Sequence, residues 1–375
     1  MVGGGIAGLL TALELLRLGA DVTLFESLKS LGSRRHCAGI VSIRTIEAIP
    51  YARSFVDALY SAARIFASPR GPELRIVCSK PFAAHMDRVG HEQLLAEKIL
   101  ERGADVRLGA LVIDVRDCGR GLELTYLDRS SHELKRLSSA FDAVVVAEGF
   151  SRRLSRALGL EALRETFIGV QRVYAVSRGR VEELITVFDS ALGRGGFAWL
   201  APLGEERALV GVVGEGVSIE DLDRYARLLA RVSGVDLQPL GPAFGGYVFR
   251  GYPKRLARGR VVGIGDCVCM VKSLSGGGLY AISESFRHVA HYLVERRRDA
   301  IDALKSVSRV LRRQYRVYRV ALYLMRVASI ALRGRVFVVE MRELDYDRHD
   351  ELLGRMMRSL WGGAVKRWRR ADSHP

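Results

Sequence analysis

The first thirty positions alternate between glycine-rich and apolar stretches, which predicts a turn, a helix and a strand in that order. Three glycines with G-x-G-x-x-G spacing open the chain: Gly3, Gly5 and Gly8. Apolar residues then recur at helical intervals until Gly19, and a β-rich run over 21–25 ends in Glu26. A glycine turn, a helix and a strand with a terminal acid are together typical of a dinucleotide-binding unit.

The remaining pattern predicts an α/β fold. Helices are expected over 90–102, from about 275 to 295, and over 302–333. Strands are expected over 104–108, 112–115, 122–127, 134–137, 143–147 and 260–266. The β-branched run at 143–147 favours a buried parallel strand, whereas the three strands before it favour a small antiparallel meander. Residues 165–250 are richer in strand patterns and glycine.

Dinucleotide chemistry gives each part of the first unit a role. Gly3 makes the tight turn, Gly5 lets the backbone approach a pyrophosphate, and Gly8 lets the helix pack closely on the strand. The start of the helix, around Ala7, directs free N–H groups at the anion. Glu26 at the end of the second strand would accept hydrogen bonds from a ribose. The alternative is an ordinary glycine-rich loop.

The strand before the glycine turn is too short for this pattern. Such a turn normally follows a strand of about five residues, but only Met1 and Val2 precede Gly3. We therefore expect the central strand to be almost absent, because the coding start lies further upstream or because the strand is lost. The first explanation is favoured, and either one predicts weakened cofactor binding.

A second glycine-rich segment follows the strand at 260–266 and favours FAD over NAD alone. Asp266, after Gly265, is placed to reach a ribityl hydroxyl. The glycines Gly276, Gly277 and Gly278 open a predicted helix, whose N–H groups would face the flavin O2 and N1 atoms. Taken alone, Gly265 and Asp266 also fit a strand-terminating turn. Only one dinucleotide fingerprint is present, so a separate NAD(P)H domain is not expected.

Composition and charge narrow the class of protein. The chain has 375 residues, 49% hydrophobic and 27% charged, which excludes disorder, collagen and a simple coiled coil. Its net charge is +16, and 50 of its 58 basic residues are Arg. Such charge suits nucleic acid, an anionic membrane or a phosphorylated substrate, since Arg binds phosphate bidentately. A genomic bias from Lys to Arg is the alternative, and no nucleic-acid module is recognised.

Cysteine usage and hydropathy exclude further classes. The five cysteines do not form a disulfide scaffold, and the C-x-C spacing of Cys267 and Cys269 is not a zinc pattern, so no metal site is expected. No secretory signal is visible. The best membrane-span candidate, 317–339, contains four arginines. We expect a cytoplasmic protein, with peripheral membrane association as an open alternative.

Several separated motifs carry a family resemblance. They are, in order, the glycine turn with Glu26, His36–Gly39, Met86–Arg88, Ala147–Ser151, Gly196–Pro202, and Gly265–Asp266 followed by Gly276–Gly278. Over about residues 1–300 the chain thereby resembles the geranylgeranyl reductase family, flavoproteins that share a fold with p-hydroxybenzoate hydroxylase. The resemblance implies that Arg88, Glu148 and Gly149 contact FAD. Glu148 replaces an aspartate of the family, and Phe197, Ala201, Ser273 and residues 267–269 also depart from its motifs.

The resemblance implies a reductase that saturates isolated C=C bonds of geranylgeranyl chains in isoprenoid lipids or their diphosphate precursors, with hydride from reduced FAD. The electron donor would be reduced ferredoxin or NAD(P)H. Cys37 is the candidate for active-site chemistry, with Arg34 and Arg35 placed to stabilise a thiolate. Phe197 and Trp199 would line the lipid pocket. The alternatives are packing roles for these side chains, and a redox pair at residues 267 and 269.

Two other functions stay open at this stage. The same fold serves flavin monooxygenases that hydroxylate apolar substrates. A degenerate lipid-binding relative with weak FAD binding is the non-enzymatic alternative, because the first strand and the second flavin motif are altered.

The resemblance also implies a domain organisation. We expect a Rossmann-like FAD-binding domain over 1–50, 80–160 and 255–300. A mainly antiparallel β-sheet substrate domain would interrupt it over 51–79 and 161–254. Residues 301–375 would form a helical C-terminal region.

The predicted helix at 302–333 carries basic residues along one line: Lys305, Arg309, Arg312, Arg316, Arg319, Arg326 and Arg333. They form either a solvated face of a helix packed on the body, or a surface for a membrane or a phosphate. The basic aromatic segment 366–370 allows the same two interpretations.

Overall fold

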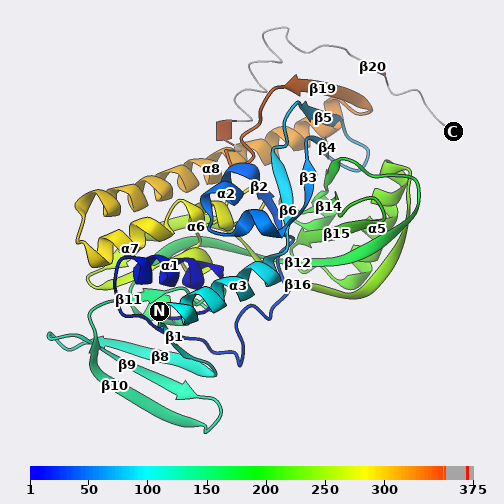
Figure 1. Cartoon of the computed structure of the whole chain (residues 1–375). Coiled ribbons are helices and arrows are strands. Elements are labelled where there is room, and N and C mark those ends of the chain that lie inside the picture. The colour runs from blue at the N-terminus through cyan, green and yellow to red at the C-terminus, as the bar shows by residue number, and fades with distance from the viewer. Residues whose placement is uncertain (349, 352–368, 371–375) are drawn as a thin grey trace.

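A parallel sheet assembled from distant parts of the chain lies at the centre of one half of the molecule (Figure 1). The computed structural model describes residues 1–348, 350–351 and 369–370. The sheet's elements are β1 (Thr23–Phe25), β7 (Asp105–Arg107), β11 (Val144–Val146), β18 (Val261–Gly263) and the antiparallel β17 (Ala257–Arg258). β1 pairs with β7, and β11 pairs with β18, in parallel. The parallel strand predicted from the valine run is therefore confirmed.

A single residue holds the middle of this sheet. Val2 bridges β1 on one side and β11 on the other, both in parallel. Its N–H donates to Val145 O at 2.9 Å, and Ala147 N–H donates to Val2 O at 2.7 Å. The prediction that the central strand is almost absent is confirmed, yet both neighbouring strands are joined through it.

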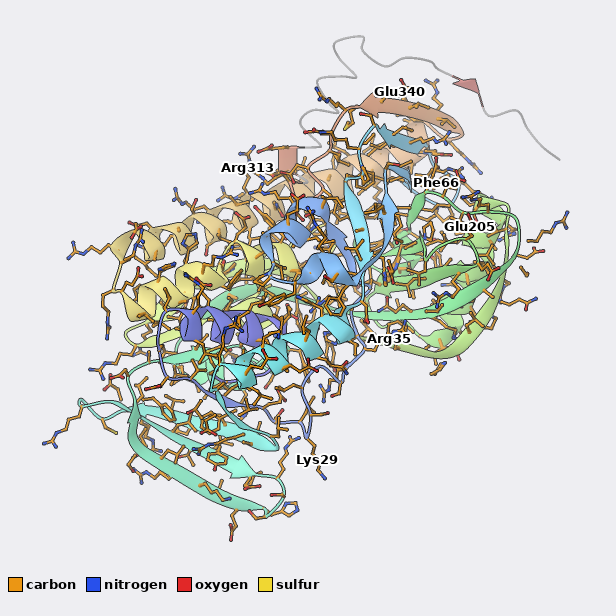
Figure 2. All side chains as sticks on the ribbon, viewed as in Figure 1. Lys29, Arg35, Phe66, Glu205, Arg313 and Glu340 are labelled. Atoms are coloured by element: carbon orange, nitrogen blue, oxygen red, sulfur yellow. The ribbon has the colours of Figure 1, made fainter. Side chains whose placement is uncertain are left out.

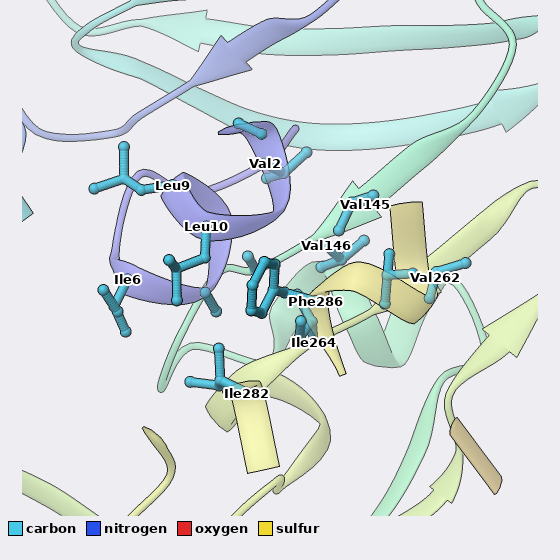
Figure 3. Packing of buried hydrophobic residues seen from close by; sticks show 14 of the residues in the cluster. Val2, Ile6, Leu9, Leu10, Val145, Val146, Val262, Ile264, Ile282 and Phe286 are labelled. Atoms are coloured by element: carbon cyan, nitrogen blue, oxygen red, sulfur yellow. The ribbon is translucent and has the colours of Figure 1, made fainter. Parts of the chain in front are cut away.

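Apolar side chains from helices and strands pack together against this sheet (Figure 3). α1 (Ile6–Arg17) contacts both α3 (Arg88–Glu101) and α7 (Phe286–Val294). The fully buried Leu9 and Leu10 of α1, Val146 of β11 and Phe286 of α7 belong to one core cluster. A helix was predicted without interruption from about 275 to 295. The structure instead has a short α6 (Leu279–Ser283), and Ser285 leaves the helical conformation with φ −120° before α7 starts.

The predicted meander is also present. It consists of β8 (Ala110–Asp117), β9 (Leu122–Asp128) and β10 (Glu133–Phe141), paired antiparallel. A second small sheet has the order β2 (Ile40–Ser42), β6 (Ala83–Met86) and β3 (Val56–Tyr60). Short helices α2 (Ile43–Ala48) and α4 (Arg153–Ala157) follow β2 and β11, and 3-10 turns lie at Ala52–Phe55, Ser190–Leu192 and Gly265–Val268.

A large, mostly antiparallel sheet forms the other half of the molecule. Its order is β16 (Asp236–Arg255), β12 (Glu161–Arg178), β15 (Arg207–Gly214), β14 (Phe197–Pro202), β13 (Leu184–Phe188), β4 (Ala62–Phe66), β5 (Glu73–Cys78), β19 (Arg335–Met341) and β20 (Arg369–Arg370). α5 (Ile219–Ser233) packs its apolar side on this sheet through Leu222 and Leu229. A capping box between Ser218 and Asp221 starts α5, and Gly234 ends it in the left-handed conformation. The predicted α/β fold with an interrupting antiparallel sheet is confirmed.

The long helix α8 (Arg298–Ala331) runs along α7 and ends beside the edge of the large sheet (Figure 1). The C-terminal region that was expected to be helical contains α8 and also a strand, β19, which pairs in parallel with β5. Its run of β-branched and aromatic residues, Val336–Val339, favours a strand over a helix. No helix in the described part of the chain is apolar over enough length to span a bilayer. Of the predicted basic tail, 366–368 lie outside the described residues.

Candidate functional site

A cavity of about 1040 Å³ lies where the parallel strands end and the large sheet begins. The segments that follow β1, β11 and β18 form one wall, and β12, β13, β14 and β16 form the other. The structure brings these sequence-predicted residues to the cavity lining: Gly3, Gly5, Ala7, Glu26, Cys37, Arg88, Glu148, Gly149, Phe197, Trp199, Gly265, Asp266, Gly276, Gly277 and Gly278. Of the predicted set, only Gly8 lies behind this lining.

The glycine turn is closely packed, and the helix after it begins with amides that have no helical acceptor. Gly3 has φ +101°, and a Cβ there would lie 2.3 Å from Ala147 O. A Cβ on Gly8 would lie 2.0 Å from Gly3 O, so a side chain would force α1 away from the turn. The first intrahelical bond runs from Leu9 N–H to Gly5 O at 3.0 Å. The amides before Leu9 lack helical acceptors and suit an anion.

The Glu26 carboxylate closes this turn from the side. Oε2 accepts from Gly4 N–H at 2.7 Å, and Oε1 accepts from Leu28 N–H at 2.8 Å. The side chain is buried yet lines the cavity. A carboxylate has about four acceptor positions, so capacity remains for a hydroxyl of a bound ribose.

The second glycine-rich segment forms a folded loop between Asp266 and α6. Lys272 N–H donates to Gly277 O at 2.9 Å, and Gly276 N–H donates to Lys272 O at 2.8 Å. Burial raises the pKa of Asp266, although the charges of His36 and Arg88 oppose this shift. The three glycines were expected to open a long helix, but α6 has only five residues, so the expected helix dipole is weak here.

The Glu148 carboxylate is already engaged by the protein backbone. It accepts from Leu154 N–H at 3.1 Å and from Ser155 N–H at 2.6 Å, both in the first turn of α4. This longer replacement for the family's aspartate therefore anchors a helix. Gly149, with φ +65°, turns the chain beside it. Their contact with a cofactor stays a prediction.

Cys37 lies on the cavity wall with two donors aimed at its sulfur. Arg88 Nη1 lies 3.5 Å from Sγ, and Gly39 N–H donates to Sγ at 3.4 Å. Arg35, which was expected to act on this thiol, instead stacks over Phe244 of β16 at 4.4 Å and lies between α3 and the large sheet (Figure 2). Arg88 thus takes the place beside the sulfur that the sequence assigned to the loop arginines.

The two predicted aromatic residues project from β14. The rings of Phe197 and Trp199 lie 5.8 Å apart, and Phe188 lies 5.5 Å from Phe197. A Cβ on Gly211 would lie 2.1 Å from the indole, so this glycine makes room for Trp199. The aromatic rings give this wall of the cavity an apolar surface.

Polar groups without partners show what else the cavity suits. Four lining residues each have a buried polar atom that no protein group satisfies: Arg88 Nε, Gln171 Oε1, Trp199 Nε1 and Ser275 Oγ. Buried polar atoms are nearly always hydrogen-bonded in folded proteins. Together with the amides at the start of α1 that lack helical acceptors, they fit an elongated ligand that has both phosphate and ring polar groups, such as FAD.

Cys267 and Cys269 are buried free thiols behind the cavity wall. Cys267 Sγ donates to Val146 O at 3.1 Å and to Ile264 O at 3.3 Å. Burial raises the pKa of Cys267, and it raises the pKa of Cys269 to about 12. Both side chains therefore act as protonated packing groups, and the redox-pair alternative finds no thiolate here.

Sequence reasoning missed the residues that close the cavity from the C-terminal side. Lys272 and Tyr346 line it, and Asp347 lies directly behind them. Lys272 Nζ lies 2.7 Å from Asp347 Oδ1 and 4.6 Å from the centre of the Tyr346 ring. A lysine between Asp266 and the three glycines was a visible signal. No local sequence pattern marks Tyr346 and Asp347, because the pairing of β19 with β5 brings them to the cavity.

Comparisons with known proteins agree with this geometry. A family model described as FAD binding domain matches residues 1–189. A relative from Methanopyrus kandleri, named digeranylgeranylglycerophospholipid reductase 2, is 28% identical over 296 residues, which cover 75% of this chain and 72% of the relative. A crystal structure described as geranylgeranyl bacteriochlorophyll reductase-like, from Thermoplasma acidophilum, has a TM-score of 0.75 and 17% identity over 94% of both chains.

Another solved structure with a similar fold contains FAD. The flavin-dependent monooxygenase PieE, in complex with FAD and substrate, has a TM-score of 0.62 and 19% identity over 89% of this chain and 63% of its own. At these identities the structures show the fold alone. The expected FAD cofactor and the resemblance to geranylgeranyl reductases are confirmed. Since the family model covers half of the chain, this protein belongs to the FAD binding domain family and is an FAD-dependent oxidoreductase.

Proposed function

We propose that this oxidoreductase saturates isolated C=C bonds in the geranylgeranyl chains of isoprenoid lipids or their diphosphate precursors. One observation carries the proposal: an aromatic wall from the large sheet and an anion-binding glycine turn face the same cavity. An apolar chain is thereby held against a nucleotide-bound ring system. The names of the Methanopyrus relatives, at 28% and 27% identity, point to the same substrate class.

In this proposal the residues divide between cofactor and substrate. Gly3, Gly5 and Ala7 would hold the pyrophosphate, and Glu26 would hold the adenosine ribose. The flavin part would be held by Arg88, Glu148, Gly149, Gly265, Asp266, Gly276, Gly277 and Gly278. Gly8 supports them from behind by letting α1 approach the turn. The domain boundaries given above are part of the same proposal.

Saturating an alkene needs a hydride at one carbon and a proton at the other. The bound flavin supplies the hydride and must then be reduced again by an external donor, reduced ferredoxin or NAD(P)H. Phe197 and Trp199 would hold the chain flat against the ring and exclude water. Cys37 would lie at the reacting end of the chain, where the Arg88 guanidinium and the Gly39 N–H both donate to its sulfur.

We further propose that α8 rests on an anionic membrane that holds the substrate. Its last three turns expose apolar side chains on one side: Val320, Tyr323, Leu324, Val327 and Ile330. Ile330 alone is 81% exposed. The predicted basic line borders this apolar side through Arg319, Arg326 and Arg333, all exposed. Apolar residues flanked by arginines are typical of a helix that lies in the membrane interface.

The decisive experiment measures the product mass. Protein loaded with FAD and reduced anaerobically with dithionite is given a geranylgeranyl lipid, and we expect mass increases in steps of two hydrogens. Cys37→Ala should lower the rate at least tenfold. Cys118→Ala, which removes another exposed cysteine, is the matched control and should not.

The same preparation separates the alternative functions. A monooxygenase would add no hydrogen to the lipid in the anaerobic assay. Given O₂, its reduced form would consume the gas rapidly and add oxygen to the substrate. A lipid-binding relative would show no absorbance near 450 nm after FAD is supplied. Either result would refute the proposed reductase.

A further inference from the structure

Four arginines surround a second cavity beside the one described above. This cavity has a volume of about 530 Å³ and is lined by Ser151, Arg152, Arg153, Arg156 and Arg164. Three of the arginines lie at or in α4, and Arg164 comes from the adjacent end of β12. Ser151 and Arg153 also line the larger cavity, so the two cavities share part of one wall.

None of these four guanidinium groups forms an ion pair with a carboxylate of the described residues. Elsewhere arginines find acidic partners, as Arg64 does in Glu73 at 2.6 Å. Glu148, the acidic residue that precedes α4, is engaged by the amides of α4 instead. Within the described residues, no ion pair therefore offsets the positive charge of this cavity.

Two of the arginines are fixed in place by the backbone. Arg153 Nη2 donates to Val112 O at 2.8 Å, and Arg164 Nη1 donates to Phe150 O at 3.0 Å. The Arg164 guanidinium also lies 3.9 Å above the Phe249 ring. These contacts orient the groups without using their charge, which leaves a preorganised site for an anion.

The other two arginines keep unused donors. Arg152 Nε is buried and has no hydrogen-bond partner, and the side chain of exposed Arg156 has none within the described residues. Burial and the neighbouring Arg152 charge lower the pKa of Arg164. Such repulsion between like charges is relieved when an anion binds between them.

The surroundings of this arginine pocket indicate what else the anion carries. Phe150 and Tyr247 stack at 5.4 Å on the lining of the larger cavity, and both are about half exposed. Phe249, which lies under Arg164, belongs to the same lining. A cationic pocket thus lies beside an aromatic, apolar surface, which matches a molecule with a phosphoryl head and an apolar tail.

We propose that Arg152, Arg153, Arg156 and Arg164 form a phosphoryl-binding site that holds the phosphate or diphosphate end of the substrate while its apolar chain enters the larger cavity. This inference rests on the proposed function for the identity of the tail, but not for the binding of the phosphoryl group. Planar guanidinium forks bind phosphate oxygens in pairs, so four of them suit a group with two or more negative charges.

The binding test uses inorganic pyrophosphate and the FAD-loaded protein. Calorimetric titration at fixed ionic strength should show one site, and Arg152→Ala with Arg156→Ala should weaken it at least tenfold. The matched control, Arg227→Ala with Arg231→Ala, removes the same charge from exposed positions on α5 and should leave the affinity unchanged. Equal loss in both pairs, or no loss in the first, would overturn the site.

A second measurement separates the phosphoryl site from the cofactor site. Both double variants should retain absorbance near 450 nm, because the glycine turn is intact. Loss of FAD from the Arg152/Arg156 variant alone would overturn the proposal, since the arginines would then hold the cofactor. If the alanine pair fails to fold by circular dichroism, Arg152→Gln with Arg156→Gln replaces it and the same outcomes apply.

Steady-state kinetics identify the source of the phosphoryl group. For a substrate headgroup, the variant should raise KM at least tenfold for geranylgeranyl diphosphate and leave KM for geranylgeraniol unchanged. Loss of pyrophosphate binding with unchanged KM for the diphosphate would overturn the headgroup assignment and leave a site for a free phosphate compound. An absence of any reductase activity would refute the proposed function, whereas the pyrophosphate titration would still decide the site.

Discussion

The buried pair of Lys272 and Asp347 permits a quantitative test of how the cavity is closed. The side chains are 5% and 1% exposed, and Nζ lies 2.7 Å from Oδ1. Asp347 also accepts hydrogen bonds from the hydroxyl groups of Ser42 and Thr45, the latter at 2.8 Å. Its carbonyl oxygen accepts from Gln314 Nε2 at 2.8 Å. One residue, Asp347, thus joins the loop that carries Lys272, α2, α8 and the segment after β19.

Removing one member of this pair should cost far more than removing both. Asp347→Asn leaves the Lys272 ammonium buried without a counter-charge, which costs about 3–5 kcal/mol in the free energy of unfolding. Lys272→Met leaves a buried carboxylate with two hydroxyl donors and should cost about 3 kcal/mol. The double variant removes both charges, and replacement of a buried pair by apolar groups is often nearly neutral. We expect it within about 2 kcal/mol of the parent.

Urea denaturation of the four proteins at pH 7, each loaded with FAD, measures this cycle by linear extrapolation. The coupling energy between the two sites should be at least about 2 kcal/mol. An Asp347→Asn variant within about 1 kcal/mol of the parent would refute the reasoning. Additive losses in the double variant would refute it equally, because the two side chains would then act independently.

The pH dependence has a defined sign. Burial alone would raise the pKa of Asp347, but Lys272 and the hydroxyl donors outweigh it and the pKa is lowered. A carboxylate with a lowered pKa in the folded state stabilises the protein above its unfolded pKa of about 3.9. That stabilisation is lost as the pH falls below this value toward the folded pKa. The stability gap between the parent and Asp347→Asn should therefore persist from pH 7 to about pH 4 and narrow below it.

Three further predictions follow from single features. Gly8→Ala should lower the free energy of unfolding by more than about 2 kcal/mol, because the new Cβ would lie 2.0 Å from Gly3 O. Gly5→Ala has open space around its Cβ, so it should keep the melting temperature of the FAD-free protein. It should instead weaken FAD binding, as measured by fluorescence titration. Ile330→Glu should lower co-sedimentation with anionic vesicles at least threefold; Leu134→Glu, at an exposed apolar position on β10, should not. Ser218→Ala should cost about 1 kcal/mol in urea unfolding through loss of the α5 cap.

The parts of the fold that sequence predicted share one property: the signal and the structure are local. The valine run at β11 becomes buried because both faces of that strand are covered. The glycine turn needs small residues wherever α1 touches it, so the spacing of Gly3 and Gly8 is visible in the sequence itself. Local patterns of this kind also identified the cofactor, and the predicted site residues other than Gly8 all lie on the cavity lining.

The elements that sequence missed depend on partners far along the chain. β19 forms only because β5, more than 250 residues earlier, offers a parallel edge. Glu148 has the position of a family aspartate, but its extra methylene lets it reach the amides of α4, and no spacing rule shows that choice. Tyr346 and Asp347 reach the cavity through β19, so the closing contact follows from the same unpredicted pairing.

The excess of positive charge shows most clearly what composition alone cannot predict. Composition reports one number, +16, but the structure distributes arginines over surfaces with different neighbours. On α8 the guanidinium groups border exposed apolar side chains, a combination that favours a lipid surface. Around α4 they converge on a pocket that borders an aromatic cavity, a combination that favours a single phosphoryl group. The side chains beside each group of arginines therefore decide which kind of partner it binds. Removing the same number of arginines from α8 or from the pocket at α4 should weaken binding of different ligands, anionic vesicles in the first case and pyrophosphate in the second.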